Sequence, residues 1–148
     1  MQQRHYHSKE LRAGRCSEAG RIYHVRSSSA QKRPLFHDFK AARLLIHCLE
    51  EQQRHGFAQT LAFVVMPDHL HWLLQLRGQR ELGQVIGTVK SLSARRIGSR
   101  IWQPGFYDRA LRSEDDLHGI ARYIVANPVR AGLVARVGEY PHWDCVWL

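Results

Sequence analysis

Two histidines, His69 and His71, stand one residue apart in the segment VVMPDHLHWLLQL. Side chains alternate between the two faces of an extended strand, so both imidazoles point to the same face. This spacing sets the rings side by side, at a distance suited to sharing one divalent metal ion. A polar, partly exposed sheet face is the simpler interpretation of the same pattern. The metal interpretation therefore needs a third ligand and a reactive group nearby.

Tyr123 and Asn127 supply both kinds of group. They are four residues apart, so on a helix they lie on one face, one turn apart. A tyrosine hydroxyl, with an ordinary pKa of about 10, is a poor nucleophile unless its substrate is made electrophilic beside it. Taken alone, the pair is also compatible with a half-buried helix tyrosine and a helix-ending asparagine.

These two motifs carry a resemblance to a known family. MPDHLH (66–71) followed downstream by YIVANPVRAGLV (123–134) resembles the single-tyrosine HUH transposases, which include the IS200-like enzymes. The similarity is greatest to their REP-associated branch, which acts on repetitive extragenic palindromes in bacterial genomes. With the intervening WQPGFYDRALRSEDDL, it extends over most of the chain after about residue 20.

The resemblance implies a reaction and its residues. In the family, a tyrosine attacks a phosphate of single-stranded DNA near a hairpin, with Mg²⁺ or Mn²⁺ bound, and leaves a 5′-phosphotyrosine linkage and a free 3′-hydroxyl. Here it implies Tyr123 as the nucleophile and His69, His71 and Asn127 as metal ligands. Many single-tyrosine relatives have glutamine at the position of Asn127, so the shorter asparagine requires a closer approach of helix and sheet.

The charge distribution favours a nucleic-acid partner. The net charge is +9, and two stretches, 1–34 and 77–112, each contain eight basic and two acidic residues. Most of the basic residues are arginines, which suit bidentate phosphate contacts and base-edge recognition. We expect the DNA-binding residues among these stretches: Arg12, Arg15, Lys90, Arg95, Arg96, Arg100, Arg109 and Arg112.

The hydrophobic patterns predict an α+β, ferredoxin-like fold: an antiparallel sheet with two helices on one face and a C-terminal catalytic helix. A basic flexible arm is expected over 1–20 and one domain over 21–148. Strands are expected at 21–26, 60–66, 69–76 and 106–111, and helices at 38–54 and 79–98. The two helices should cover Leu70, Trp72, Leu74 and Leu76, which leaves the histidines on the open face.

The third helix should position the tyrosine. Ser113 is expected to cap it, with a buried stripe of Leu117, Ile120, Ala121 and Ile124. Because Pro128 disfavours helical geometry at the preceding residue, we expect the helix to end with Asn127 on its last turn. The tail from Trp143 to Leu148 is interpreted as a core cover, with stacking on a base as the alternative.

Several broad classes are excluded. No apolar run reaches the roughly 18 residues that span a bilayer, and the polar N-terminus does not resemble a secretory signal. Cys16, Cys48 and Cys145 lack the paired spacing of zinc or disulfide sites, so we expect them to be reduced. The sequence thus predicts a cytoplasmic, nucleoid-associated bacterial protein, monomeric or homodimeric, with no membrane partner.

Two rival functions remain open at this point. The same fold and charge suit a module that binds hairpin DNA or structured RNA without cutting it. A metal-dependent hydrolase using His69 and His71 is a third class, but it lacks an evident carboxylate base. Asp68 is the available candidate, and as a turn residue it is interpreted as fixing the hairpin.

Overall fold

The computed structural model describes residues 20–98 and 100–148. Residues 1–19 of the expected arm, including Arg12 and Arg15, lie outside this part. The helices and strands are, in order, β1 (Ile22–Ser28), α2 (Phe39–Arg54), β2 (Ala58–Met66), β3 (His69–Leu76), α3 (Leu82–Ile97), β4 (Tyr107–Ala110), α4 (Leu117–Val125), α5 (Asn127–Arg130) and β5 (Trp143–Cys145). Short 3₁₀ turns lie at Ala30–Lys32, Leu35–His37 and Val137–Glu139.

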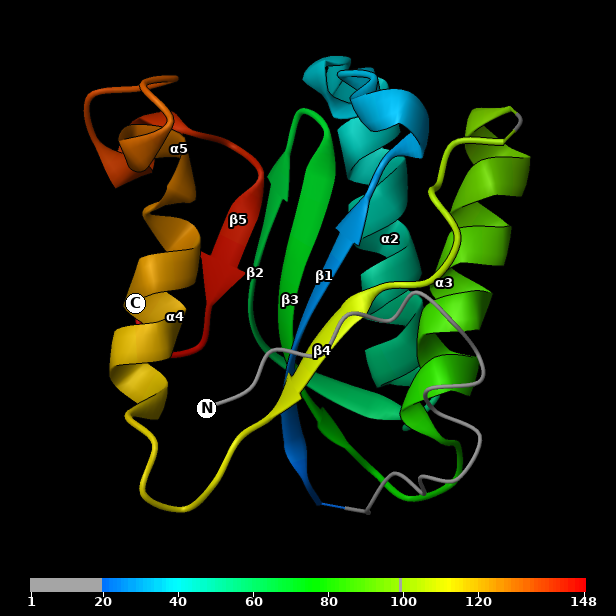
Figure 1. Cartoon of the computed structure of the whole chain (residues 1–148), viewed down its shortest axis with the longest axis vertical. Coiled ribbons are helices and arrows are strands. Elements are labelled where there is room, and N and C mark those ends of the chain that lie inside the picture. The colour runs from blue at the N-terminus through cyan, green and yellow to red at the C-terminus, as the bar shows by residue number, and fades with distance from the viewer. Residues whose placement is uncertain (1–19, 99) are drawn as a thin grey trace.

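The strands form one antiparallel sheet in the order β4-β1-β3-β2-β5. Strand β3, which carries the two histidines, is central and pairs with β1 on one side and β2 on the other (Figure 1). The first four strands have the expected ferredoxin-like arrangement, and each of the predicted strands is present within a few residues of its expected ends. Strand β5 adds a fifth member at the β2 edge.

The larger core lies between the sheet and helices α2 and α3, which cover the same face (Figure 1). Its β3 residues are the four that the alternation predicts: Leu70, Trp72, Leu74 and Leu76, all nearly inaccessible to solvent. The indole Nε1 of Trp72 donates to Thr60 Oγ1 at 2.9 Å, so the one polar atom of this buried ring is satisfied. This face of β3 is therefore committed to packing.

A smaller core lies on the opposite face, where helix α4 packs against the sheet (Figure 1). It joins the inward side of α4 to β2, β3 and β5, through Val64, Leu73, Ala121, Ile124 and Cys145. Helix α4 covers only the β2 side of this face. The part of β3 that carries the histidines thus lines a cavity beside α4.

The beginning of α4 differs from the prediction. Asp116, not Ser113, is the N-cap: its side chain accepts a hydrogen bond of 3.0 Å from the backbone N–H of Gly119. The preceding residues form a turn in which Asp115 Oδ2 accepts from Arg112 N at 2.6 Å. Because aspartate also caps helices well, the local sequence offers several competing starts, and the turn at 112–115 selects the later one.

The end of α4 also differs. The helix ends at Val125, and Asn127 is the first residue of the short helix α5 rather than a last-turn residue of α4. Pro128 lies in the first turn of α5, where its missing N–H and fixed φ are tolerated. The proline therefore breaks the chain into two helices instead of simply ending one.

The tail is only partly a core cover. Strand β5 pairs with β2, Cys145 is buried, and Trp143 Nε1 donates to the carbonyl of Val137 at 3.1 Å. The last three residues, from Val146 to Leu148, are exposed. Within the described ranges, no helix is both long enough and apolar enough to cross a membrane.

The packing predicts which leucines matter for stability. Leu74→Ala should lower the free energy of unfolding by about 2–5 kcal/mol, because Leu74 is fully buried and a cavity would remain. Leu133→Ala is the control, since Leu133 is 47% exposed, and should change it by less than about 0.5 kcal/mol. Denaturant unfolding measures both. Similar losses in the two variants would contradict the assignment of the core.

Candidate active site

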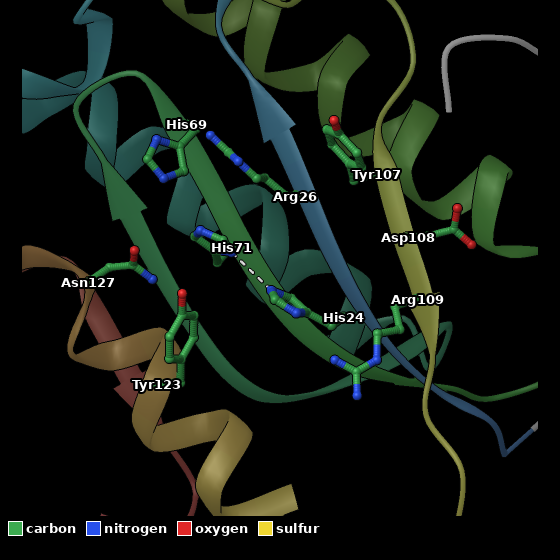
Figure 2. A pocket seen from close by; sticks show the side chains of 9 residues that line it. All are labelled: His24, Arg26, His69, His71, Tyr107, Asp108, Arg109, Tyr123 and Asn127. Atoms are coloured by element: carbon green, nitrogen blue, oxygen red, sulfur yellow. Dashed lines mark hydrogen bonds between the residues drawn. The ribbon is translucent and has the colours of Figure 1, made fainter. Parts of the chain in front are cut away.

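The accessible part of the open face is a cavity of about 290 Å³ beside helix α4. Figure 2 shows that side chains from β1, β3, β4, α4 and α5 point into it. All three residues implied for metal binding line it together with the implied nucleophile Tyr123. The full lining is His24, Arg26, His69, His71, Tyr107, Asp108, Arg109, Tyr123 and Asn127.

His69 is held by the residue that precedes it. Its Nδ1 lies 2.7 Å from Asp68 Oδ1, and because a carboxylate can only accept, Nδ1–H is the donor. The Asp68 carbonyl in turn accepts from the Ser29 backbone N–H at 2.9 Å and from Ser29 Oγ at 3.1 Å. The lone pair of the imidazole is therefore on Nε2. Asp68 fixes the turn, as predicted from the sequence, and also orients His69.

His71 has a partner that the sequence did not reveal. His24 lies on β1, and its Nε2 is 2.9 Å from His71 Nδ1 (Figure 2). One proton is shared between these two nitrogens. When His71 Nδ1 donates it, Nε2 of His71 carries the lone pair, as in His69. The His69 and His71 ring centroids are 5.0 Å apart, so the two rings are close neighbours.

Asn127 is oriented by the helix break. In an uninterrupted helix, the carbonyl of Ile124 would accept from the N–H four residues later, but that residue is Pro128, which has none. Asn127 Nδ2 donates to this carbonyl instead, at 3.0 Å. The amide oxygen Oδ1 is thereby the atom left for a ligand.

The three side chains thus share one arrangement. In each, one polar atom is hydrogen-bonded to the protein. The atoms that remain for a metal are Nε2 of His69, Nε2 of His71 and Oδ1 of Asn127. In the described part of the chain, no group of three or more His, Cys, Asp or Glu side chains could hold a metal ion. A metal in this cavity would therefore need the asparagine oxygen as its third protein ligand.

Burial keeps these histidines neutral. It lowers the pKa of His71 well below its ordinary 6.5, with the neighbouring His24 and His69 acting in the same direction. Burial also lowers the pKa of His69, more than the hydrogen bond to Asp68 raises it. The pKa of His24 falls to about 4, through burial and then the charge of Arg109. Neutral imidazoles are the form that binds metals.

Tyr123 is accessible where the histidines are not. Its side chain is on the solvent-facing border of α4, with 58% of the residue exposed, whereas His71 is only 8% exposed. Figure 2 shows the hydroxyl pointing toward the side of the cavity that holds His71 and Asn127. The guanidinium carbon of Arg130 lies 3.6 Å from the centre of the Tyr123 ring. An incoming substrate can therefore reach the hydroxyl.

The expected DNA-binding residues are dispersed. Arg109 lines the cavity, with its Nη2 3.5 Å from Asp115 Oδ1, and Arg112 is exposed beyond the end of β4. Arg95 and Arg96 are on α3, behind the sheet as seen from the histidines, and Arg96 forms an ion pair of 2.5 Å with Glu51. The structure does not bring the α3 residues to the cavity.

Of the remaining expected residues, Lys90 lies on α3 and Arg100 lies just after it. Arg100 is exposed just after the helix, and its carbonyl accepts from Arg33 Nη2 at 3.0 Å. Lys90 is a correction to the prediction of a phosphate-contacting surface. Its Nζ donates to the carbonyls of Gln103 and Gly105 and is part-buried, so it holds the loop after α3.

The sequence did not identify His24, Arg26 and Arg130 as site residues. His24 and Arg26 stand at alternate positions of a predicted strand, which was a usable signal, but nothing local indicates that this strand lies beside His71. Arg130 is part of the YIVANPVRAGLV motif, three residues after Asn127. Only the fold places it on the tyrosine ring.

Comparisons with known proteins identify the family of this chain. A family model described as "Transposase IS200 like" matches residues 19–127. The chain is 30% identical, over 101 residues, to the REP-associated tyrosine transposase of Escherichia coli (strain K12), which covers 67% of this chain and 61% of that protein. The chain spans about three fifths of the length of the curated relatives that it matches.

A solved structure of a REP-associated tyrosine transposase bound to a REP hairpin has the same fold. The two share 25% sequence identity, with a TM-score of 0.77, and the match covers 87% of this chain and 79% of the other.

The neutral state of His24 predicts a pH dependence of stability. The unfolded chain has the ordinary pKa of 6.5 and the folded chain about 4, so the unfolded state binds more protons between these values. The stabilisation of the folded protein by a neutral His24 is therefore complete above pH 6.5. It is lost as the pH falls toward 4. His24→Gln should reduce the slope of unfolding free energy in this window by about 1.4 kcal/mol per pH unit, the value for one proton. Denaturant unfolding at several pH values measures this slope, and an unchanged slope would contradict a buried, neutral His24.

Proposed function

Because this chain belongs to the IS200-like transposase family, we propose that it cleaves and rejoins single-stranded DNA beside a hairpin, with Tyr123 as the nucleophile. One observation carries the proposal: an accessible tyrosine hydroxyl faces a cavity in which His69, His71 and Asn127 leave their acceptor atoms uncommitted.

Mg²⁺ or Mn²⁺ is the proposed cofactor. Two imidazole nitrogens and one amide oxygen are all neutral donors, which would hold a divalent ion without cancelling its charge. Bound there, such an ion polarises phosphate oxygens and offsets the charge that develops at phosphorus. Asp68, His24 and the Ile124 carbonyl orient the donors, and burial keeps the imidazoles unprotonated at neutral pH.

The reaction is a transesterification in which Tyr123 supplies the attacking oxygen. A bond forms between that oxygen and phosphorus, the phenol proton is released, and the bond from phosphorus to the 3′ oxygen breaks. The products are a 5′-phosphotyrosine and a 3′-hydroxyl. A 3′-hydroxyl can later attack the same phosphorus and return the oxygen to Tyr123. One ester replaces another in each step, so rejoining needs no external energy source.

The proposed substrate is hairpin DNA with a single-stranded flank, and the related solved structure is bound to a REP hairpin. Of the DNA-binding residues expected from the sequence, Arg109 lines the cavity and Arg112 lies just beyond β4, so both are candidate phosphate contacts. The residues on and after α3 could contact only DNA that extends beyond the cavity. Tyr123 lines the same cavity as His69 and His71, so the tyrosine is proposed to act beside its own histidines, in a monomer or a homodimer. A bacterial cytoplasm, in contact with the nucleoid, is the proposed setting.

Tyr123→Phe tests the nucleophile. This variant should form no covalent adduct with hairpin DNA in the presence of Mn²⁺, because only the attacking oxygen is removed, while its affinity for the hairpin should stay nearly unchanged. The adduct is measured on a denaturing gel with DNA from the genome that encodes the chain. Tyr107→Phe should keep the adduct, although Tyr107 also lines the cavity. An adduct that persists in Tyr123→Phe would identify another nucleophile.

Hairpin binding without any adduct in the unmodified protein would instead indicate the non-catalytic binding module. That outcome would leave the fold and the family unaffected, because neither depends on the reaction.

Replacing His69 and His71 together by Ala tests the metal. Cleavage should be lost, and calorimetry with DNA present should detect no Mn²⁺ binding, because two of three protein ligands are gone. The control replaces two exposed histidines, His47 on α2 and His55 just after it, by Ala and should leave both measurements unchanged. Cleavage at the unmodified rate by the His69/His71 variant would return the pair to a purely structural role.

A further inference from the structure

Arg26 lines the same cavity and has no role in the reaction described above. It lies on β1, directly opposite His71 on β3 and opposite Tyr107 on β4. Its side chain is on the same face as His24, two residues earlier, and Figure 2 shows the guanidinium extending toward His69. A permanently charged group is thus placed in the cavity lining, beside His69 and His71.

Within the described ranges, the Arg26 side chain forms no hydrogen bond or ion pair with another residue. Its Nε is buried without any partner. Arg109, on the other side of the same cavity, is paired with Asp115, and Arg96 is paired with Glu51. A partly buried guanidinium without a partner is costly, because the lost hydration is not replaced. This arrangement suits an anion that arrives with the substrate.

A metal ion cannot be that partner. A guanidinium has five N–H donors and no acceptor, and its positive charge repels a cation. The positive charge already affects the neighbourhood, since Arg26 is among the causes that lower the pKa of His24, His69 and His71. A phosphodiester carries two non-bridging oxygens, and the planar fork of an arginine matches them in charge and shape.

We propose that Arg26 binds a non-bridging oxygen of the phosphate that Tyr123 attacks, from the β1 side of the cavity. This inference rests on the proposed function and adds a catalytic residue to it. No bond to Arg26 forms or breaks. The guanidinium donates hydrogen bonds to oxygens on which negative charge increases as the fifth bond to phosphorus forms, so it stabilises the transition state more than the ground state.

Two other arginines near the tyrosine fit this role less well. Arg109 already has Asp115 as a partner, and Arg130 is exposed and stacked on the Tyr123 ring. Arg26 is unpartnered and faces the histidines. Its position has a second consequence: in the free protein it opposes metal binding, and a phosphate placed between the two positive charges removes the repulsion. Metal and DNA should therefore strengthen each other's binding.

The first experiment measures binding in EDTA, so that it is independent of metal and of cleavage. Each phosphate in the flanks of the hairpin DNA is replaced in turn by an uncharged methylphosphonate. The affinity is measured for Tyr123→Phe and for Tyr123→Phe combined with Arg26→Gln. One position should weaken binding to Tyr123→Phe by about tenfold, the order of one charge-assisted hydrogen bond, and should have no effect on the double variant.

The position found in this scan is then compared with the phosphate that the unmodified protein cleaves. Coincidence supports the inference. A position that depends on Arg26, in a protein that forms no adduct, would overturn the proposed reaction and the identity of the phosphate but not the phosphate contact itself. If the methylphosphonate scan weakens binding equally in Tyr123→Phe and in Tyr123→Phe with Arg26→Gln, the inference is overturned even if cleavage is normal.

The second experiment uses the protein with Tyr123 intact. Arg26→Gln should slow single-turnover cleavage by about 10²–10³-fold, whereas free Arg26→Gln should bind Mn²⁺ several-fold more tightly than the unmodified protein. Arg54→Gln removes a charge from the exposed end of α2 and should change neither value. A general loss of structure would weaken metal binding, so the opposite directions separate the proposed role from damage to the fold.

If Arg26→Gln does not fold, as judged by circular dichroism, Arg26→Lys takes its place in both experiments. Lysine keeps the charge and loses the bidentate fork. The methylphosphonate at the sensitive position should therefore weaken binding several-fold less than it does with Arg26 present, and cleavage should be about tenfold slower than in the unmodified protein. A methylphosphonate profile and a cleavage rate like those of the unmodified protein would overturn the inference.

Discussion

One face of strand β3 is apolar and buried and the other carries two histidines, and the rest of the structure depends on this difference. Leu70, Trp72, Leu74 and Leu76 are buried under α2 and α3 on one face. Because side chains alternate strictly along a strand, this burial forces His69 and His71 to the other face. A slip of one residue would exchange the faces, placing imidazoles in an apolar core. Hydrophobic burial therefore sets the direction of the histidines before any interaction of their own.

The orientation of the side chains on that face depends on hydrogen bonds to the atoms that a metal would not use. Asp68, His24 and the carbonyl of Ile124 each engage one donor or acceptor of a neighbouring side chain. These bonds are short and part-buried, so they restrict ring and amide rotation without any ligand present. The same burial holds the imidazoles in their neutral form. Positioning and protonation state thus have a common physical origin.

The break between α4 and α5 connects the tyrosine to this arrangement. Pro128 removes the N–H that would satisfy the carbonyl of Ile124, and the side chain of Asn127 replaces it. The inward side of α4, including Ala121 and Ile124, packs on the sheet, which leaves Tyr123 on the accessible border. A proline that weakens a helix is thereby also the reason that an amide oxygen is available beside Tyr123, the proposed nucleophile.

The sequence by itself determined the local features: the common face of His69 and His71, the apolar face of β3, the proximity of Tyr123 and Asn127, and the element order. Each depends on a period of two or 3.6 residues, which neighbouring residues express directly. The sequence also indicated the wrong cap for α4 and a single end for that helix, because several residues near Ser113 and Pro128 satisfy the same local rules.

Only the tertiary structure decided which distant residues meet. The antiparallel register of β1 with β3 brings His24 and Arg26 beside His71, and the packing of α3 removes Arg95 and Arg96 from the cavity. Lys90 has a side chain suited to contacting phosphate, but its Nζ donates to loop carbonyls instead. Strand pairing and helix packing join segments far apart in the chain, and their free energy depends on burial summed over the whole core. No local pattern contains that sum, which is why the shared face of His69 and His71 was evident from the sequence and the residues around them were not.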